Sequence, residues 1–115
     1  MNRLIACAVV ALLAGCGTTP KEVMESGTRT VHVLKLPADR AAHCLARNIE
    51  NHRSIFNATV RPANGAYEVV VRFGGEHTGF VAQVEPAIDG ARATVWYRGY
   101  LAGGDEAKAA MLAGC

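Results

Sequence analysis

The feature that most limits the fold is the dipeptide Asn64-Gly65, which stands between two runs of alternating apolar residues. Asn-Gly is the strongest short signal for a two-residue β-hairpin turn, because both central residues need a positive φ. A register that pairs Ala63 with Ala66 gives an apolar face with Val60 opposite Val69, Ala58 opposite Val71 and Phe56 opposite Phe73. The other face then pairs Arg61 with Glu68 and Asn57 with Arg72. Turn and pattern therefore select the same register, and they predict an antiparallel hairpin with one apolar face.

A second hairpin is predicted around Asp89-Gly90, and residues 74–79 form the loop between the two hairpins. Setting Ile88 opposite Ala91 pairs Val84 with Val95 and Ala82 with Tyr97 on the core face. The same register puts Glu85 opposite Thr94, Gln83 opposite Trp96 and Val81 opposite Arg98 on the open face.

Three further segments have clear patterns. Residues 28–36 are rich in β-branched residues and are predicted to form a strand. After Pro37, residues 38–51 have the spacing of a helix whose apolar stripe is Ala38, Ala41, Ala42, Leu45 and Ile49, with Cys44 on its flank. Gly103-Gly104 ends the last strand, and Asp105 is a good N-cap for a final helix with Ala107, Ala110, Met111 and Gly114 inward.

The predicted order is β-α-β-β-β-β-α, an α+β two-layer sandwich. Because one sheet face is fully apolar, both helices are expected to cover that face of an antiparallel five-stranded sheet. This order resembles the TATA-binding-protein-like and helix-grip topologies, which imply a strand order of 1-5-4-3-2. The resemblance is one of topology and carries no functional residues with it.

The N-terminus is typical of an export signal. Asn2 and Arg3 precede ten apolar residues, 4–13, which are too few to span a bilayer as a helix. The run ends in Leu13-Ala14-Gly15-Cys16, which resembles the lipobox of bacterial lipoproteins. That resemblance implies removal of residues 1–15 as a signal peptide and attachment of diacylglycerol and an acyl group such as palmitate to Cys16. The alternative is a buried apolar helix with an incidental cysteine.

Acyl chains on Cys16 would anchor the protein stably, because two or more chains are needed for firm attachment to a membrane. Gly17, rather than aspartate, follows Cys16, and by resemblance to enterobacterial sorting this favours the outer membrane, facing the periplasm. Residues 16–27 are predicted to be a lipidated tether, of which ten residues reach at most about 35 Å, and residues 28–115 a single domain.

The expected processing assigns a role to each cysteine. The chain has four cysteines, of which Cys7 leaves with the signal and Cys16 carries lipid. The remaining pair, Cys44 and Cys115, is expected to form a disulfide in the oxidising periplasm. It would close a loop of roughly 70 residues, worth about 4 kcal/mol in the chain-entropy model. The alternative is a reactive or metal-binding thiol pair.

Composition excludes several classes of protein. A chain of 115 residues has room for one small domain, and 50% apolar residues argue against a disordered chain. The formal charge is +2, and loss of Arg3 leaves 11 basic and 10 acidic residues. A nucleic-acid partner is therefore not expected.

No catalytic, metal or cofactor residues are predicted. The histidines, His32, His43, His52 and His77, lack any HxxxH, HxH or HExxH spacing. The serines lack a nucleophile-elbow context, and the Gly-Gly pairs match no phosphate-binding pattern.

The open sheet face is the candidate binding surface, with Trp96, Arg98, Tyr100 and Arg72 as its main residues. Trp, Tyr and Arg are enriched at binding hot spots, although such residues also simply suit strands. We expect a non-catalytic interaction or scaffold domain that binds an unknown envelope protein or a second copy of itself. The alternative is a small periplasmic enzyme or inhibitor acting on a cell-envelope substrate, which would need a polar cleft lined by Glu68, Glu85 or His77.

The chain from Cys16 onward also looks like the small uncharacterised lipoproteins common in β-proteobacteria. The matching features are Leu13-Ala14-Gly15-Cys16, residues 41–48 (AAHCLARN), residues 67–72 (YEVVVR) and Gly114-Cys115. The resemblance implies a bacterial envelope location and no known activity.

Overall fold

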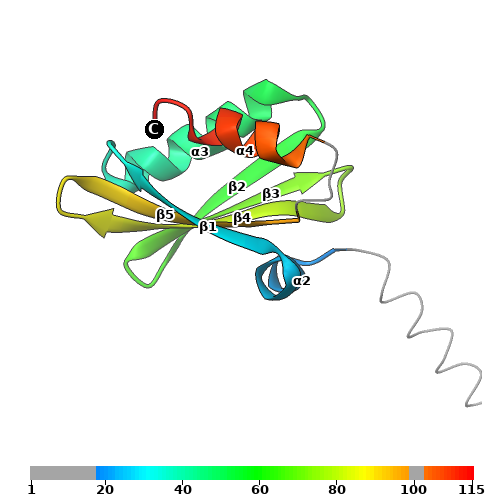
Figure 1. Ribbon diagram of the computed structural model, residues 1–115, viewed down its shortest axis with the longest axis horizontal. Coiled ribbons are helices and arrows are strands. Elements are labelled where there is room, and N and C mark those ends of the chain that lie inside the picture. Colours follow the sequence, from blue (N-terminus) through cyan, green and yellow to red (C-terminus); the bar gives the residue numbers. More distant parts are fainter. Residues whose placement is uncertain (1–17, 99–102) are drawn as a thin grey trace, which may run out of the picture.

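The computed structural model describes residues 18–98 and 103–115. They form three helices and an antiparallel sheet of five strands in the order β1-β5-β4-β3-β2 (Figure 1). The strands are β1 (Thr28–Leu34), β2 (Phe56–Ala63), β3 (Ala66–Phe73), β4 (His77–Ala87) and β5 (Gly90–Tyr97). The helices are α2 (Pro20–Ser26), α3 (Ala38–His52) and α4 (Gly104–Leu112). The predicted α+β class and strand order are confirmed. The predicted signal peptide, Cys16 and Tyr100 lie outside the described residues.

The first hairpin has the predicted register. Ala63 pairs with Ala66, Val60 with Val69 and Phe56 with Phe73. Asn64 and Gly65 both have positive φ, 51° and 78°, as a two-residue hairpin turn requires. Local turn chemistry and side-chain alternation are sufficient to determine this pairing.

The second hairpin forms where expected, but the predicted register is wrong by two residues. Ala87 pairs with Gly90, so Ile88 and Asp89 make the turn, and Val84 faces Ala93 rather than Val95. The reason lies in the neighbouring strand: a Cβ on Gly90 would stand 2.1 Å from the Leu34 carbonyl oxygen, so this glycine is needed inside the sheet. A shift of two residues preserves the faces, because side chains alternate with a period of two.

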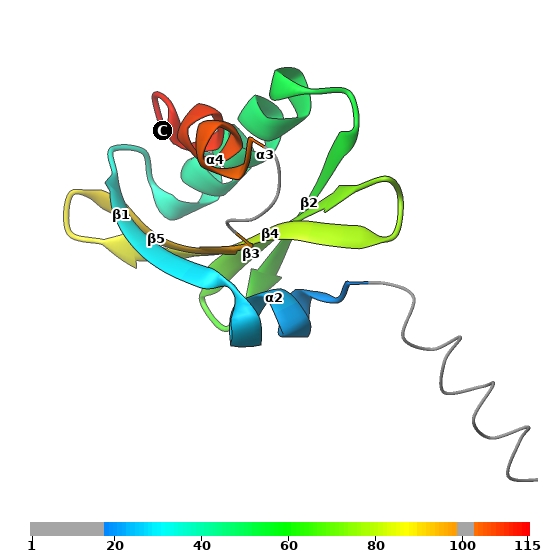
Figure 2. The ribbon, with the colours of Figure 1, turned by 45° about the vertical axis from the view of Figure 1, so that its right-hand side comes forward.

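The main core lies between the sheet and the pair α3 and α4, which cover the same face (Figure 2). The predicted stripe of α3 is buried, and its central residues Leu45 and Ile49 have no exposed surface. On the sheet side the largest fully buried side chain is Phe80, and on α4 it is Met111.

The start and the inward stripe of α4 differ from prediction. Gly103, with φ of 74°, occupies the N-cap position, so Asp105 lies inside the first turn and is not the cap. Its carboxylate instead accepts a hydrogen bond from the Tyr97 hydroxyl. Ala110 is only half-buried and Gly114 is exposed with φ of 74°, so neither is part of the core.

Residues 20–26, expected to belong to an extended tether, form helix α2 on the sheet face opposite α3 and α4 (Figure 2). The Thr19 side chain accepts a hydrogen bond from the Glu22 N–H at 3.2 Å, and Pro20 occupies the first turn. Val23 has no exposed surface, and the paired residues Val70 and Val81 are buried on the face that α2 covers. The helix forms because it buries this small second core.

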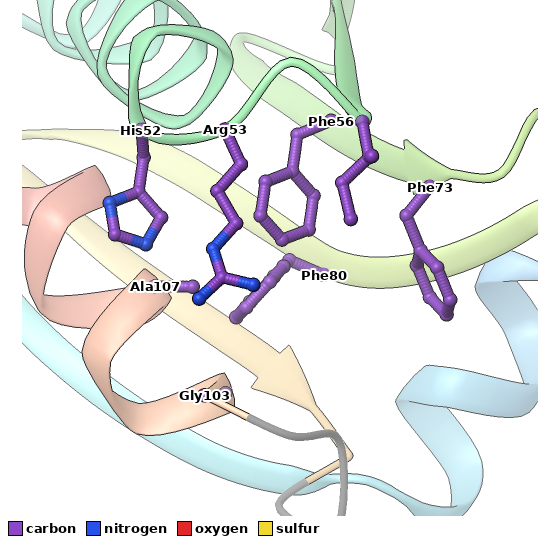
Figure 3. A pocket seen from close by; sticks show the side chains of 9 residues that line it. His52, Arg53, Phe56, Phe73, Phe80, Gly103 and Ala107 are labelled. Carbon is purple, nitrogen blue, oxygen red and sulfur yellow. The ribbon is translucent and has the colours of Figure 1, made fainter.

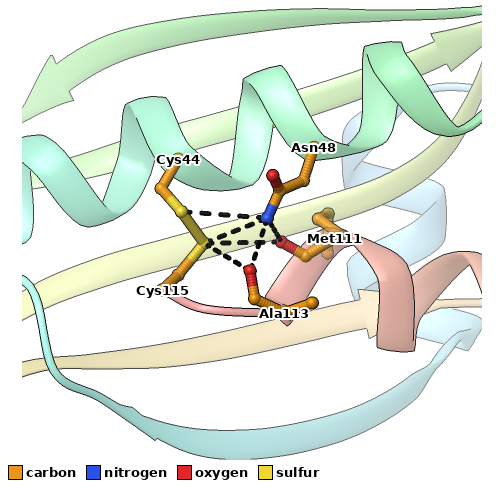
Figure 4. Close-up of a disulfide and its surroundings, with 5 residues drawn as sticks. All are labelled: Cys44, Asn48, Met111, Ala113 and Cys115. Atoms are coloured by element: carbon orange, nitrogen blue, oxygen red, sulfur yellow. Dashed lines mark hydrogen bonds between the residues drawn. A yellow bond between two sulfur atoms is a disulfide. The ribbon is translucent and has the colours of Figure 1, made fainter.

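The C-terminal segment is attached to α3 by the predicted disulfide between Cys44 and Cys115 (Figure 4). Asn48, one turn further along α3, donates its amide hydrogens to the main-chain oxygens of Ala113 at 2.8 Å and Met111 at 3.1 Å. The N–H groups of Lys35 and Leu36 donate to the Cys115 oxygen at 3.0 and 2.9 Å. The disulfide and these hydrogen bonds therefore join α4 to both α3 and the end of β1.

Candidate functional site

The open sheet face carries a shallow depression of about 370 Å³ at the strands β1, β5 and β4. It is lined by seven residues, which we name the open-face patch: Arg29, Val31, Gln83, Glu85, Arg92, Thr94 and Trp96. Trp96 is half-buried here. The patch lies on the same face as α2 but is not lined by it.

The patch combines exposed apolar surface with paired charges. Val31 is 48% exposed, and Val33, on the same face of β1, is 86% exposed. Glu85 and Arg92 stand directly opposite each other and form an ion pair at 3.1 Å. Apolar and aromatic contact area bordered by charged groups is the arrangement typical of protein-binding surfaces.

The structure does not bring together the three predicted face residues that it describes, Trp96, Arg98 and Arg72. Arg98 is directed toward α2, where its Nη2 donates to the Ser26 hydroxyl at 3.1 Å and lies 3.8 Å from the Glu22 carboxylate. Arg72 is exposed and lines a separate, smaller depression with Pro20 of α2. Tyr100 is outside the described residues, so Trp96 is the predicted residue that belongs to the open-face patch.

Two parts of this surface were missed by the reasoning from sequence. The β1 residues Arg29 and Val31 were not assigned to the face, although strand alternation places them there. Helix α2 was also missed, although Thr19-Pro20-Lys21-Glu22 has the Ser/Thr-x-x-Glu pattern of a capping box with proline at N1.

A second concave region, which we name the aromatic pocket, lies between the helix layer and one end of the sheet (Figure 3). Its volume is about 260 Å³. The lining residues are His52, Arg53, Ile55, Phe56, Phe73, Phe80, Gly103, Gly104 and Ala107. The pocket was not predicted, because its lining comes from five elements, α3, β2, β3, β4 and α4, which span most of the domain sequence.

A polar cluster stands between β1, β5 and α4. Lys108 Nζ lies 4.7 Å from the centre of the Tyr97 ring and donates to its hydroxyl at 3.3 Å. His32 contacts the Thr30 hydroxyl at 2.8 Å. Burial, and to a lesser extent the Lys108 charge, lower the pKa of His32 below its ordinary value of 6.5. The hydroxyl of Tyr97 is engaged by two partners, so the cluster has the character of a structural network.

The carboxylates that a hydrolytic site would use are engaged as well. Glu68 and Glu85 line a depression of about 210 Å³, but Glu68 pairs with Arg61 at 2.7 Å and Glu85 with Arg92. His77 is not part of that depression; its ring stacks on Phe73. Within residues 18–98 and 103–115, no group of three or more His, Cys, Asp or Glu side chains could hold a metal ion.

No family of known proteins matches the chain, and neither does any curated protein or solved structure. Among the described helices, none is long and apolar enough to cross a membrane.

Proposed function

We propose that the chain is a lipid-anchored, non-catalytic protein of the bacterial cell envelope whose open-face patch binds another envelope protein. In this proposal Cys16 carries the acyl chains and the domain lies on the periplasmic side of the outer membrane. Support comes from the lipobox after a signal-like segment, and from the Cys44–Cys115 disulfide, a bond that forms and persists in oxidising compartments.

The distance between anchor and domain is short. The Thr78 N–H donates to the Thr18 oxygen at 3.0 Å, so the folded domain begins at Thr18 rather than after a long tether. Only Gly17 separates Thr18 from Cys16, and two residue steps along the chain reach about 7 Å at most. A lipidated Cys16 would therefore hold the domain directly against the membrane and restrict the directions in which the open-face patch can point.

The observation that carries the binding proposal is the exposure of Val31, a residue of the patch, and of Val33, which pairs with the patch residue Arg92, on the face that also carries Trp96. Burying exposed valines favours association, at roughly 25 cal/mol per Å² of apolar surface. Trp96 adds a large ring of the type that dominates binding energy at interfaces. An envelope protein with a complementary apolar surface is the proposed partner, and a second copy of the chain is the alternative outcome of the test.

Site-specific photo-crosslinking in cells tests the surface. A photoreactive residue at Val33 should give a discrete adduct, whereas the same residue at Ile88, which is fully exposed at the β4–β5 turn, should not. Val33→Asp should abolish co-purification of the crosslinked partner without loss of folding. Adducts of equal strength at both positions, or none at Val33, would contradict the proposal.

Metabolic labelling tests the anchor. Radioactive palmitate should be incorporated into the wild-type chain, and Cys16→Ala should abolish incorporation and release the protein from the membrane fraction. An unlabelled wild-type chain would contradict lipidation.

A further inference from the structure

The aromatic pocket lies at the end of the domain where the chain enters. Phe73 forms one wall and pairs with His77, whose ring stacks on it at 5.5 Å. The next residue, Thr78, is the one that bonds to Thr18. Neighbouring strands are about 4.8 Å apart, so the pocket wall and the point of attachment are separated by only one or two strand spacings.

The lining of the pocket is apolar apart from His52 and Arg53. Ile55, Phe56, Phe73, Phe80 and Ala107 supply aliphatic and aromatic surface, and Ile55 is 55% exposed at the rim. Arg53 points into the same space, with its guanidinium beside the Phe80 ring and Ala107 (Figure 3).

Among the described residues, the charge of Arg53 has no acidic counterpart in the pocket. No aspartate or glutamate is among the described lining residues, and none of the ion pairs between described residues includes Arg53. Asp105, which follows the lining residue Gly104 in the sequence, is engaged by the Tyr97 hydroxyl. An apolar cavity with one cation at its edge is complementary to a ligand with an aliphatic tail and an anionic head.

The size of the pocket limits the tail. A closed apolar cavity of about 150 Å³ accepts benzene, so 260 Å³ accommodates several more methylene groups than one ring. Each buried methylene contributes about 0.8 kcal/mol. A medium-length acyl chain matches this volume, whereas a bulky or strongly polar molecule does not.

We propose that the aromatic pocket binds a fatty acid, with its tail against Phe56, Phe73 and Phe80 and its carboxylate on the Arg53 guanidinium. The membrane is the source of the ligand, because a lipidated Cys16 places this end of the domain beside it. The proposal that the fatty acid comes from the membrane rests on the proposed anchor, whereas the proposal that the pocket binds a fatty acid does not. The acyl chains of the anchor itself have no carboxylate and would leave Arg53 unused.

Binding is measured on residues 16–115 exported without lipid as a Cys16→Ser variant, since every described element lies within that range. Decanoate should bind saturably by calorimetry. Decanol, which has the same tail and no charge, should have an affinity lower by about tenfold or more. Arg53→Glu should reduce decanoate affinity about tenfold or more and leave decanol affinity unchanged. Ile55→Asp should weaken both ligands.

Two matched variants control for general effects. Arg40→Glu makes the same charge change at an exposed position of α3, and Ile88→Asp makes the same substitution at a fully exposed isoleucine outside the pocket. Neither should alter binding. Folded protein that shows no saturable binding of decanoate, or equal losses with Arg40→Glu and Arg53→Glu, would overturn the proposal, as would density for the protein's own acyl chain in the pocket. Palmitate labelling of Cys16 is independent, so failure of the anchor and failure of the pocket are distinguishable.

Discussion

Single side chains explain how the short C-terminal helix is held in place. Asn48 spans the gap between α3 and the last turn of α4, where it satisfies carbonyl groups that have no partner within their own helix. Its amide nitrogen also lies 3.3 Å from the Cys115 sulfur. One polar side chain thus completes the hydrogen bonding around the disulfide.

Asn48→Asp should lower the free energy of unfolding by about 1–3 kcal/mol, because a carboxylate of nearly the same shape cannot donate to the two carbonyls. Asn51→Asp, on an exposed position of the same helix, is the control and should have little effect. Urea denaturation followed by circular dichroism measures both. Equal stability of the two variants would show that the Asn48 hydrogen bonds contribute nothing.

His32 makes stability depend on pH. Its pKa in the folded state is lowered by burial and by Lys108, so below about pH 6.5 the unfolded chain binds a proton that the folded chain resists. The free energy of unfolding should therefore fall as the pH drops through 6.5, and level off once folded His32 is also protonated. His32→Gln should flatten this part of the profile in denaturation experiments at stepped pH. A profile identical to that of the wild type would contradict the role of His32.

At the scale of elements, helix α2 is the least expected part of the fold. It has seven residues, too few to be stable alone, and one fully buried side chain, Val23. Its stability therefore depends on Val23 packing over Val70 and Val81, on the Thr19 cap and on the contact of Arg98 with Ser26.

Val23→Asp should detach α2 while the main core stays folded, since a buried unpaired carboxylate is strongly unfavourable. Hydrogen exchange should then speed up in residues 20–26 and leave α3 protected. Lys21→Asp, at an exposed position of the same helix, should preserve protection of α2. Global unfolding of Val23→Asp under native conditions would show instead that α2 is part of one cooperative core.

The two hairpin glycines should differ in their tolerance of alanine. Gly65 and Gly90 both have positive φ. A Cβ added at Gly65 would meet no atom within 4 Å, whereas a Cβ added at Gly90 would meet the carbonyl oxygens of Leu34 and Lys35, at the end of β1. Gly65→Ala should cost about 1 kcal/mol of backbone strain. Gly90→Ala should cost roughly 3 kcal/mol or more. Thermal denaturation of the two variants compares them directly, and similar losses would contradict the register found here.

For the whole molecule, the disulfide joins the last residue of the described chain to the middle of α3, 71 positions earlier. It restricts the unfolded ensemble of nearly the entire domain. Cys44→Ser/Cys115→Ser should therefore lower stability by about 4 kcal/mol in the chain-entropy model. Denaturation of oxidised and double-mutant protein measures the loss. Mass spectrometry without reductant should find the wild type lighter by two hydrogen atoms than the same protein after reduction. Free thiols on both Cys44 and Cys115 would contradict the bond.

Much of this architecture was predictable because its causes are local. The turn at Asn64-Gly65 lies next to the strands that it pairs, and the α3 stripe lies within fifteen residues, so both are visible as short patterns. The pairing of Cys44 with Cys115 was predicted from the expected processing of the N-terminus and from the two helices sharing one face of the sheet. The candidate site was harder to predict. Trp96 belongs to the open-face patch as expected, whereas Arg98 contacts α2 and Arg72 lines a separate depression.

The sequence by itself determined the α+β class, the first hairpin and the disulfide partners, and its resemblance to known topologies implied the strand order. Tertiary structure decided the register of the second hairpin, because Gly90 must pass close to Leu34, more than fifty residues away. It also decided that α2 covers one part of the open face and leaves Val31, Val33 and Trp96 accessible. It decided as well that five separate elements line the aromatic pocket. These outcomes depend on contacts between distant segments, which no local pattern of residue types encodes.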